Sequence, residues 1–231
     1  MIDFSRFEWM SFDCYGTLID WESGILGYLR PLLQSKTARI DDTAILQLYS
    51  EFEPREQSGP YRTYREVLAG VVRDFARELG LGISDAEAAA LAESIRDWQP
   101  FADTVPSLQR LRSRYKLAIL SNIDDELFAY SAAKLKVPFD AVVTAQQACA
   151  YKPAHKNFEV LLQRLGVPRD RLLHVAESLY HDVRPAAELG ITTVWVNRRQ
   201  GKAAAASRLA DTKANLEVAD LAELVRFAVP T

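Results

Sequence analysis

The stretch Trp9-Met10-Ser11-Phe12-Asp13-Cys14-Tyr15-Gly16-Thr17-Leu18 joins a short apolar segment to a turn that contains glycine. This change predicts a buried strand that ends at Phe12, with Asp13 directly beyond it. A carboxylate held at the end of a strand is a candidate covalent nucleophile. Three later segments are candidates to supply partners for Asp13: Leu120-Ser121-Asn122, Tyr151-Lys152-Pro153 and Glu177-Ser178-Leu179-Tyr180-His181-Asp182.

The composition narrows the class of protein. A chain of 231 residues with 48% hydrophobic content can bury one large core, or a core and a smaller second domain. The net charge of -3 shows no basic excess, so neither nucleic acid nor an acidic membrane surface is a favoured partner. Two cysteines are too few for a disulfide framework, and no segment at the start has a secretory pattern. We therefore expect a cytoplasmic protein without a membrane-spanning helix.

A long block between residues 22 and 98 has the pattern of helices. Val67, Val71, Phe75 and Leu79 recur every four residues, which places them on one face of a helix. Ser84, followed three residues later by Glu87, predicts a capping box that begins a helix over residues 85–98. Residues 54–60 contain two prolines and a glycine and are expected to form a loop. The block predicts an inserted helical domain over residues 20–98, within a core made of 1–19 and 99–231.

After residue 100 the pattern changes to short apolar runs that are separated by helical stretches. The runs cover residues 117–120, 141–144, 172–176 and 192–196. Alternating strands and helices predict an α/β fold, in which a parallel sheet is covered by helices on both faces. Ligands bind such sheets at the carboxyl ends of the strands. Because four polar residues follow predicted strands, one crevice can gather them: Asp13, Ser121, Lys152 and Asp182.

The four motifs, in this order and each after a predicted strand, resemble the haloacid dehalogenase superfamily of hydrolases. The resemblance covers nearly the whole chain. It implies a Rossmannoid parallel-sheet core with an inserted helical cap domain. It also implies that Asp13 attacks the substrate and forms a covalent intermediate, which water then cleaves. Lys152 is expected to keep Asp13 ionised and to orient it, while Asp182 holds Lys152 or positions the water. Three further side chains are expected to donate hydrogen bonds to the nucleophile or the substrate: Thr17, Ser121 and Asn122.

Tyr15 distinguishes between the possible reactions. Superfamily members that act on phosphate usually carry a second Asp at this position, which protonates the leaving oxygen. A halide leaves without a proton, so the pattern Asp-x-Tyr-Gly-Thr is similar to the 2-haloacid dehalogenase branch. For that branch we expect neither a metal nor another cofactor. Homodimers are common in it, so a homodimer is a possible assembly for this chain.

A 2-haloacid is a small substrate that carries a carboxylate, and a cation is expected to hold it. Arg55 is the first candidate, because the stretch from Arg55 to Arg65 is similar in spacing to a dehalogenase segment whose Arg lines the pocket. Its guanidinium offers a bidentate fork to a carboxylate. Arg62 and Arg65 compete for this role. Trp21 is expected to add an apolar wall.

Three positions depart from the dehalogenase pattern: Phe158, Glu177 and Leu179, the last of which stands where an Asn is expected. Phe158 stands six residues after Lys152, where these enzymes often carry Tyr, and it is expected near the substrate. Glu177 replaces a small polar residue and is a candidate base for the hydrolysis step. Other side chains are expected to pack or to lie at the surface, with no part in the chemistry: Cys14, His155, His174 and His181. Residues 198–215 are expected to form a surface loop or a short helix.

Three alternatives stay open. The segments over residues 12–22 and 176–182 also resemble azetidine-2-carboxylate hydrolase, a relative of the dehalogenases that opens a strained ring. A protonated ring amine leaves without an acid catalyst, so Tyr15 does not separate these two substrates. A magnesium-dependent phosphatase is the next alternative. The last is a binding protein that keeps the fold without turnover, against which the presence of Asp13, Lys152 and Asp182 argues.

Overall fold

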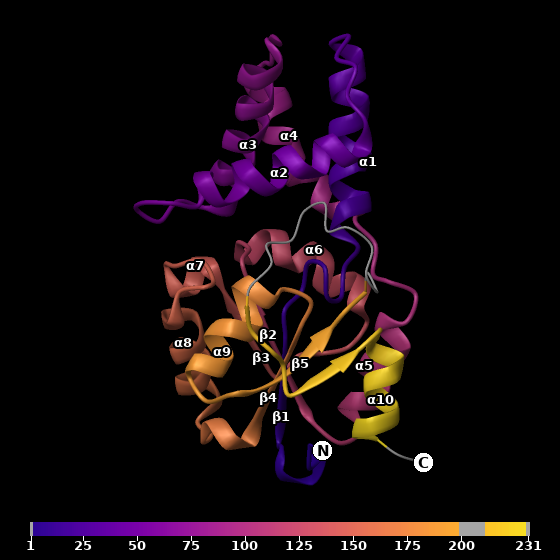
Figure 1. Ribbon diagram of the computed structural model, residues 1–231, viewed down its shortest axis with the longest axis vertical. Coiled ribbons are helices and arrows are strands. Elements are labelled where there is room, and N and C mark those ends of the chain that lie inside the picture. The colour runs from indigo at the N-terminus through magenta and orange to yellow at the C-terminus, as the bar shows by residue number, and fades with distance from the viewer. Residues whose placement is uncertain (1, 199–210, 230–231) are drawn as a thin grey trace.

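The computed structural model describes residues 2–198 and 211–229 and is built around a parallel sheet (Figure 1). The order of its six strands is β3-β2-β1-β4-β5-β6. The predicted α/β fold is confirmed, and one strand that the sequence pattern did not predict, β6, extends the sheet. The strands are β1 (Trp9–Phe12), β2 (Lys116–Ser121), β3 (Ala141–Thr144), β4 (Leu172–Ala176), β5 (Thr192–Val196) and β6 (Leu216–Val218).

Successive side chains of the strands point to opposite faces of the sheet. Met10 and Phe12 of β1 belong to one apolar core, whereas Trp9 belongs to another. Helices cover both faces, which explains why the strands read as continuous apolar runs. The first face packs against α5 (Thr104–Arg112), α6 (Asp125–Leu135) and α10 (Leu221–Ala228), and the second against α8 (His155–Leu165) and α9 (Arg184–Glu188). The remaining short elements are α7 (Ala145–Ala148), η1 (Phe4–Arg6), η2 (Ile95–Asp97), η3 (Arg169–Arg171) and the π-helical turn η4 (Leu179–Val183).

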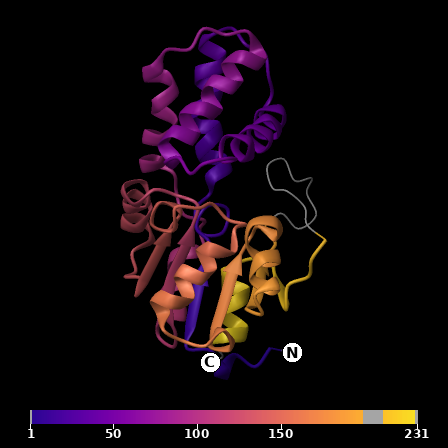
Figure 2. The same ribbon diagram turned by 90° about the vertical axis from the view of Figure 1, so that its left-hand side faces the viewer.

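Four helices stand over the carboxyl ends of the strands (Figures 1 and 2). They fall within residues 20–98, the range predicted for the cap, although the domain boundaries themselves stay a prediction. We call these helices the cap: α1 (Trp21–Ser35), α2 (Asp42–Glu56), α3 (Tyr64–Leu79) and α4 (Asp85–Ser94).

Local signals in the cap explain where its helices begin and end. The capping box of Ser84 and Glu87 is present at the start of α4, as predicted. That helix ends at Ser94 rather than at residue 98, and a 3₁₀ turn follows it. The prediction of a loop over residues 54–60 is partly wrong, because α2 continues through Pro54 to Glu56. Proline removes one backbone donor, and near the end of a helix this loss is small.

The carboxylate of Asp124 joins the cap to the core. It follows β2, is 5% exposed and accepts hydrogen bonds from the backbone N–H groups of Tyr64 (2.9 Å) and Arg65 (3.0 Å). These N–H groups belong to the first turn of α3, where helices lack internal partners. An anion at a helix N-terminus is also favoured by the helix dipole. Asp124 therefore fixes the start of α3 above the end of β2.

Two sequence expectations concern the rest of the chain. No helix among the described residues is both long enough and apolar enough to cross a membrane. The segment 198–215, which was expected to form a surface loop or short helix, lies mostly outside the described residues.

Gly24 in α1 provides a test of the packing between α1 and Trp98, the residue that follows η2. A Cβ atom at this position would lie well inside 3.0 Å of the ring of Trp98, which is 4% exposed. We predict that Gly24→Ala lowers the free energy of unfolding by about 1–3 kcal/mol, because the buried indole has little room to move. Urea unfolding measures this change.

Gly27 in the same helix is the matched control, because a Cβ there would meet no atom within 4 Å. Gly27→Ala is expected to raise the free energy of unfolding by roughly 0.5–1 kcal/mol, the usual gain for this exchange within a helix. A Gly24→Ala variant as stable as Gly27→Ala would show that Trp98 moves aside without cost.

Candidate active site

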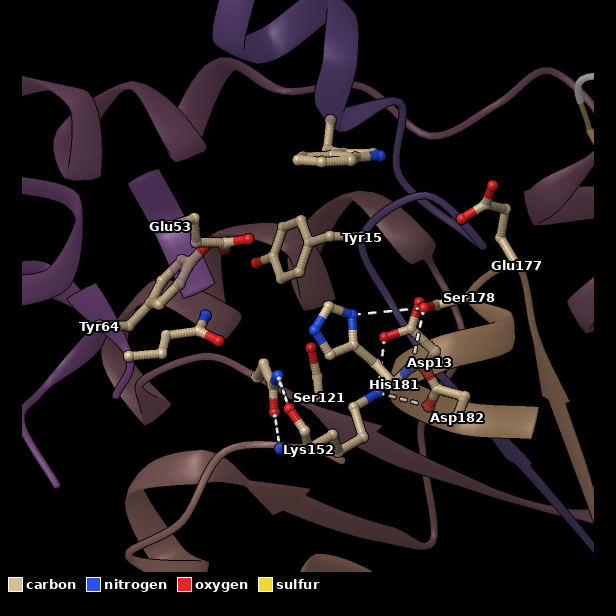
Figure 3. A pocket seen from close by; sticks show the side chains of 13 residues that line it. Asp13, Tyr15, Glu53, Tyr64, Ser121, Lys152, Glu177, Ser178, His181 and Asp182 are labelled. Atoms are coloured by element: carbon tan, nitrogen blue, oxygen red, sulfur yellow. Dashed lines mark hydrogen bonds and ion pairs between the residues drawn. The ribbon is translucent and has the colours of Figure 1, made fainter. Parts of the chain in front are cut away.

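A cavity lies between the carboxyl ends of the strands and the cap (Figure 3). Its volume is about 590 Å³ when the solvent at its mouth is included. Seven core residues that the sequence predicted for the site line it, together with residues from the cap. The lining consists of Asp13, Tyr15, Trp21, Glu53, Gln57, Tyr64, Ser121, Asn122, Lys152, Glu177, Ser178, His181 and Asp182.

The ammonium group of Lys152 joins the polar residues at the floor of the cavity. Its Nζ atom donates to Oδ1 of Asp13 (2.9 Å), to Oδ1 of Asp182 (2.6 Å) and to the backbone oxygen of Leu120 (2.9 Å). The side chain is 2% exposed. All three donors of the ammonium group therefore have an acceptor, which is the condition under which a buried charge is tolerated.

Both carboxylate oxygens of Asp13 have a donor. Lys152 contacts Oδ1, and the hydroxyl of Thr17 donates to Oδ2 at 2.7 Å. Thr17 in turn accepts from the backbone N–H of Glu177 at 2.9 Å. The backbone N–H of Asp13 donates to Val175 in the neighbouring strand β4 at 3.1 Å. The nucleophile predicted from the sequence is thus held in one orientation at the floor of the cavity.

Burial and charge act in opposite directions on the three ionisable groups. Burial raises the pKa of Asp13, although Lys152 and Thr17 oppose this effect. Burial disfavours the charge on Lys152, but the carboxylates of Asp13 and Asp182 raise its pKa above the ordinary value. Burial likewise acts against the charge on Asp182, but Lys152 and His174 hold its pKa below the usual range. The lysine therefore stays charged and makes an ionised Asp13 possible.

A buried histidine, His174, contacts the carboxylate of Asp182 on the side away from the cavity. His174 lies in β4, is 1% exposed, and its Nε2 atom lies 2.9 Å from Oδ1 of Asp182. Its Nδ1 atom lies 2.8 Å from the hydroxyl of Ser11. An ionised carboxylate only accepts hydrogen bonds, so Nε2 is the donor to Asp182. The expectation that His174 merely packs is incomplete, because its ring orients the partner of Lys152.

The segment after β2 positions Lys152 and leaves one donor for a ligand. The side-chain amide of Asn122 accepts from the backbone N–H of Lys152 (2.7 Å) and donates to its backbone oxygen (3.1 Å). Ser121 is 2% exposed, and its hydroxyl has no hydrogen-bond partner within the described structure. In Figure 3 this hydroxyl is directed into the cavity. A substrate oxygen is a suitable acceptor for it.

Tyr15 and Trp21 lie on the opposite side of the cavity from Lys152. The hydroxyl of Tyr15 lies 2.9 Å from the hydroxyl of Ser131, and burial raises the pKa of Tyr15 well above its ordinary value. The ring of Tyr15 packs edge-to-face on Trp98, with a centroid distance of 5.8 Å. Trp21 packs in the same way on Tyr49. Both rings line the cavity, as expected for the substrate-binding side.

The structure corrects the assignment of the cation from the cap. Arg55 does not line the cavity, because its guanidinium pairs with the buried carboxylate of Asp74 in α3 at 2.5 Å. The competing candidates also lie elsewhere. Arg62 pairs with Glu56 at 2.8 Å, and Arg65 pairs with Glu93. The extension of α2 through Pro54 turns Arg55 toward α3 instead of toward the sheet.

Phe158 also lies outside the cavity. Its ring is fully buried in the second core and packs edge-to-face on His174, with a centroid distance of 5.2 Å. The prediction that Phe158 lies near the substrate is therefore wrong. Phe158 instead packs against His174, which contacts Asp182. In contrast, His181 was expected to pack or to lie at the surface, and it lines the cavity. His155 lies at the surface beside Glu188, and Cys14 is buried in the core, as expected.

Three of the cap residues that line the cavity were not found from the sequence, whereas Trp21 of α1 was. Glu53, Gln57 and Tyr64 reach it from α2, from the residue after that helix and from the first turn of α3. No motif marks them, because they belong to helices whose pattern reports only an apolar face. The signal that the sequence offered was Glu53, an acidic residue near the end of α2 that follows the buried residues Tyr49 and Phe52.

The described residues contain no group of three or more His, Cys, Asp or Glu side chains that is arranged to hold a metal ion. Glu177 and Asp182 both line the cavity, but Tyr15 occupies the place where a second Asp would stand. The described lining thus consists of Lys152, four carboxylates and several neutral side chains.

Comparisons with known proteins identify the family. Residues 8–190 match the family model of haloacid dehalogenase-like hydrolases. The (S)-2-haloacid dehalogenase of Pseudomonas sp. (strain YL) is 28% identical over 192 residues, which are 82% of each chain. That of Pseudomonas putida is 24% identical over 227 residues, or 94% of this chain and 95% of the relative.

Solved structures show the same fold. The L-2-haloacid dehalogenase from Xanthobacter autotrophicus with chloropropionic acid covalently bound has a TM-score of 0.79 and 20% sequence identity. The match covers 96% of this chain and 98% of that chain. A second L-2-haloacid dehalogenase structure has a TM-score of 0.81 and covers 97% of this chain. Since the family model covers most of its length, the chain belongs to the haloacid dehalogenase-like hydrolases.

Proposed function

We propose that this protein hydrolyses the carbon–halogen bond of a small 2-haloacid through a covalent ester of Asp13. The observation that carries the proposal is the Asp13 carboxylate at the floor of the cavity, with Lys152 on one oxygen and Thr17 on the other. The names of the curated relatives, which are (S)-2-haloacid dehalogenases, support the choice of substrate.

In the first step one oxygen of Asp13 attacks C2 of the haloacid. A C–O bond forms, the carbon–halogen bond breaks, and the halide departs with the electron pair. The carboxylate must be ionised for this attack, and the charge of Lys152 favours that form. The attack is in line with the leaving halide, so the configuration at C2 is inverted.

The residue at position 15 agrees with a leaving group that needs no proton. Tyr15 lies beside the nucleophile and has a pKa raised well above its ordinary value by burial. Its hydroxyl is also engaged with Ser131. A phenol of this kind is a poor general acid at neutral pH, whereas a carboxylic acid in its place would serve an alkoxide leaving group. A halide leaves as a stable anion.

In the second step water attacks the carbonyl carbon of the Asp13 ester. Both oxygens of Asp13 have a donor, so the oxygen that remains as the carbonyl keeps one and its developing negative charge is stabilised. Glu177 lines the cavity and is the base that we assign to this water. Breakdown of the tetrahedral intermediate releases the 2-hydroxyacid and restores Asp13.

We predict that Asp13→Asn reduces chloride release from (S)-2-chloropropionate by roughly 10⁴-fold or more, because a neutral amide does not form the ester. The measurement is chloride release by purified protein in the presence of a chelator. Asp170→Asn is the control, since Asp170 is exposed and lies outside the cavity. Substantial release by Asp13→Asn would refute the assignment of the nucleophile.

Isotope labelling tests the ester directly. With enzyme in excess in H₂¹⁸O, a single turnover is expected to give unlabelled 2-hydroxypropionate, because its new hydroxyl oxygen comes from Asp13. The label is expected to enter the Asp13 carboxylate instead, and mass spectrometry of the peptide that contains Asp13 detects it. Labelled product in the first turnover would mean direct attack by water and would exclude the covalent step.

The role of Lys152 has its own test. Lys152→Met removes the charge that opposes the effect of burial on Asp13, so the pKa of Asp13 is expected to rise further. We predict a loss of chloride release of about 10³-fold or more, together with lower stability, because two buried carboxylates lose their cation. Lys156→Met, at an exposed position in α8, is the control. Activity near that of the control would remove Lys152 from the mechanism.

The same purified protein can be used to test two alternative reactions, azetidine ring opening and phosphate ester hydrolysis. Ring opening of azetidine-2-carboxylate uses the same attack beside a carboxyl group and stays a prediction. Incubation with this compound, and separately with phosphate monoesters and magnesium, tests both alternatives. Turnover of either one without halide release from 2-haloacids would replace the proposed substrate.

A further inference from the structure

The charges that line the cavity do not suit a simple anion. Four acidic residues face it, and among the described residues of its lining Lys152 is the single lysine or arginine. That lysine is already shared between two of the carboxylates. Among the described lining residues, acidic side chains therefore outnumber lysine and arginine side chains by four to one. The acidic residues are Asp13, Glu53, Glu177 and Asp182.

Glu53 contributes a carboxylate on the cap side. Its Oε1 atom accepts hydrogen bonds from the hydroxyls of Tyr64 (2.5 Å) and Tyr49 (3.4 Å). The two hydroxyls also lie 3.2 Å from each other. The side chain is half-buried and lines the cavity in Figure 3, on the side of Tyr64 and Tyr15. The tyrosines therefore hold one oxygen of the Glu53 carboxyl group at the wall of the cavity.

The environment of Glu53 favours a positively charged partner. Burial raises its pKa, the two tyrosine hydroxyls oppose this, and the charge of Asp13 adds to the increase. The hydroxyls of Tyr49 and Tyr64 are neutral donors, which satisfy an oxygen of Glu53 without neutralising its charge. A cation beside it would lower its pKa and gain a charge-assisted hydrogen bond.

The aromatic walls give a second, independent indication. Tyr15, Trp21 and Tyr64 line the same cavity as Glu53. The faces of aromatic rings attract cations, and several rings together with a carboxylate form the usual surroundings of a bound ammonium group. For a purely anionic substrate these same ring faces offer no electrostatic attraction.

From the acidic lining and the aromatic walls together, we propose that the substrate carries an ammonium group, which lies against Glu53 between the aromatic rings. This inference rests on the proposed function. It narrows the substrate class to zwitterionic 2-haloacids, which carry both a carboxylate and an ammonium group. The hydroxyl of Ser121, which is buried and has no protein partner in the described structure, is a donor for the substrate carboxylate. Glu53 is then the residue that determines specificity.

Two nearly isosteric ligands test the inference. (S)-3-Amino-2-chloropropionate and (S)-2-chlorobutyrate differ in whether an ammonium or a methyl group follows C3. Their affinities are measured by titration calorimetry with the Asp13→Asn variant, which prevents turnover. We expect the ammonium ligand to bind at least about tenfold more tightly, as one desolvated charge-assisted contact would give.

Glu53→Gln in the Asp13→Asn background identifies the residue. Glutamine keeps an oxygen that accepts from Tyr64 but has no charge, so the preference for the ammonium ligand is expected to fall about tenfold. The affinity for (S)-2-chlorobutyrate is expected to stay the same or to rise. Glu51→Gln, at an exposed position of α2, is the matched control and should keep the preference.

Equal affinity for the two ligands, or an equal effect of Glu53→Gln on both, would overturn the inference. These binding results do not depend on catalysis. If the wild-type protein binds the ammonium ligand selectively but releases no chloride from it, the proposed reaction fails and the specificity of the cavity stands. If chloride is released equally well from both compounds, the reaction stands and the inference fails.

Discussion

The site depends on one buried cation, the ammonium group of Lys152 between the carboxylates of Asp13 and Asp182. Removal of either carboxylate would leave charge in a region of low polarity, where the cost of an unpaired charge is large. The backbone oxygen of Leu120 takes the third donor. This arrangement makes the floor of the cavity one hydrogen-bonded unit, in which the orientation of Asp13, the proposed nucleophile, follows from the position of Lys152.

The parallel sheet makes this unit possible. Asp13 follows β1, Ser121 ends β2, and Glu177 follows β4, so residues as far apart in the sequence as 13 and 177 lie at one edge of the sheet. The same strands continue below the site. His174 of β4 and Ser11 of β1 extend the hydrogen-bond chain from Asp182 into the core. Catalytic orientation and sheet packing are therefore parts of one structure.

The cap supplies several of the side chains that line the cavity above Asp13. Asp124 fixes the start of α3, and this places Tyr64 against Glu53 at the top of the cavity. The arginine expected there is instead used within the cap, where Arg55 neutralises the buried Asp74. The cap thus presents a carboxylate and aromatic rings to the cavity, opposite the charged floor.

The sequence by itself determined the α/β fold, the strands over residues 9–12, 141–144, 172–176 and 192–196, and the floor of the site. Short apolar runs and strand-end motifs are local signals, and parallel strands bring their carboxyl ends together. Only the tertiary structure decided the partners of Arg55, Phe158 and Glu53. Helical periodicity identifies a buried face but not what that face meets, because the contact depends on how α2 packs against α3 and how the cap stands over the sheet.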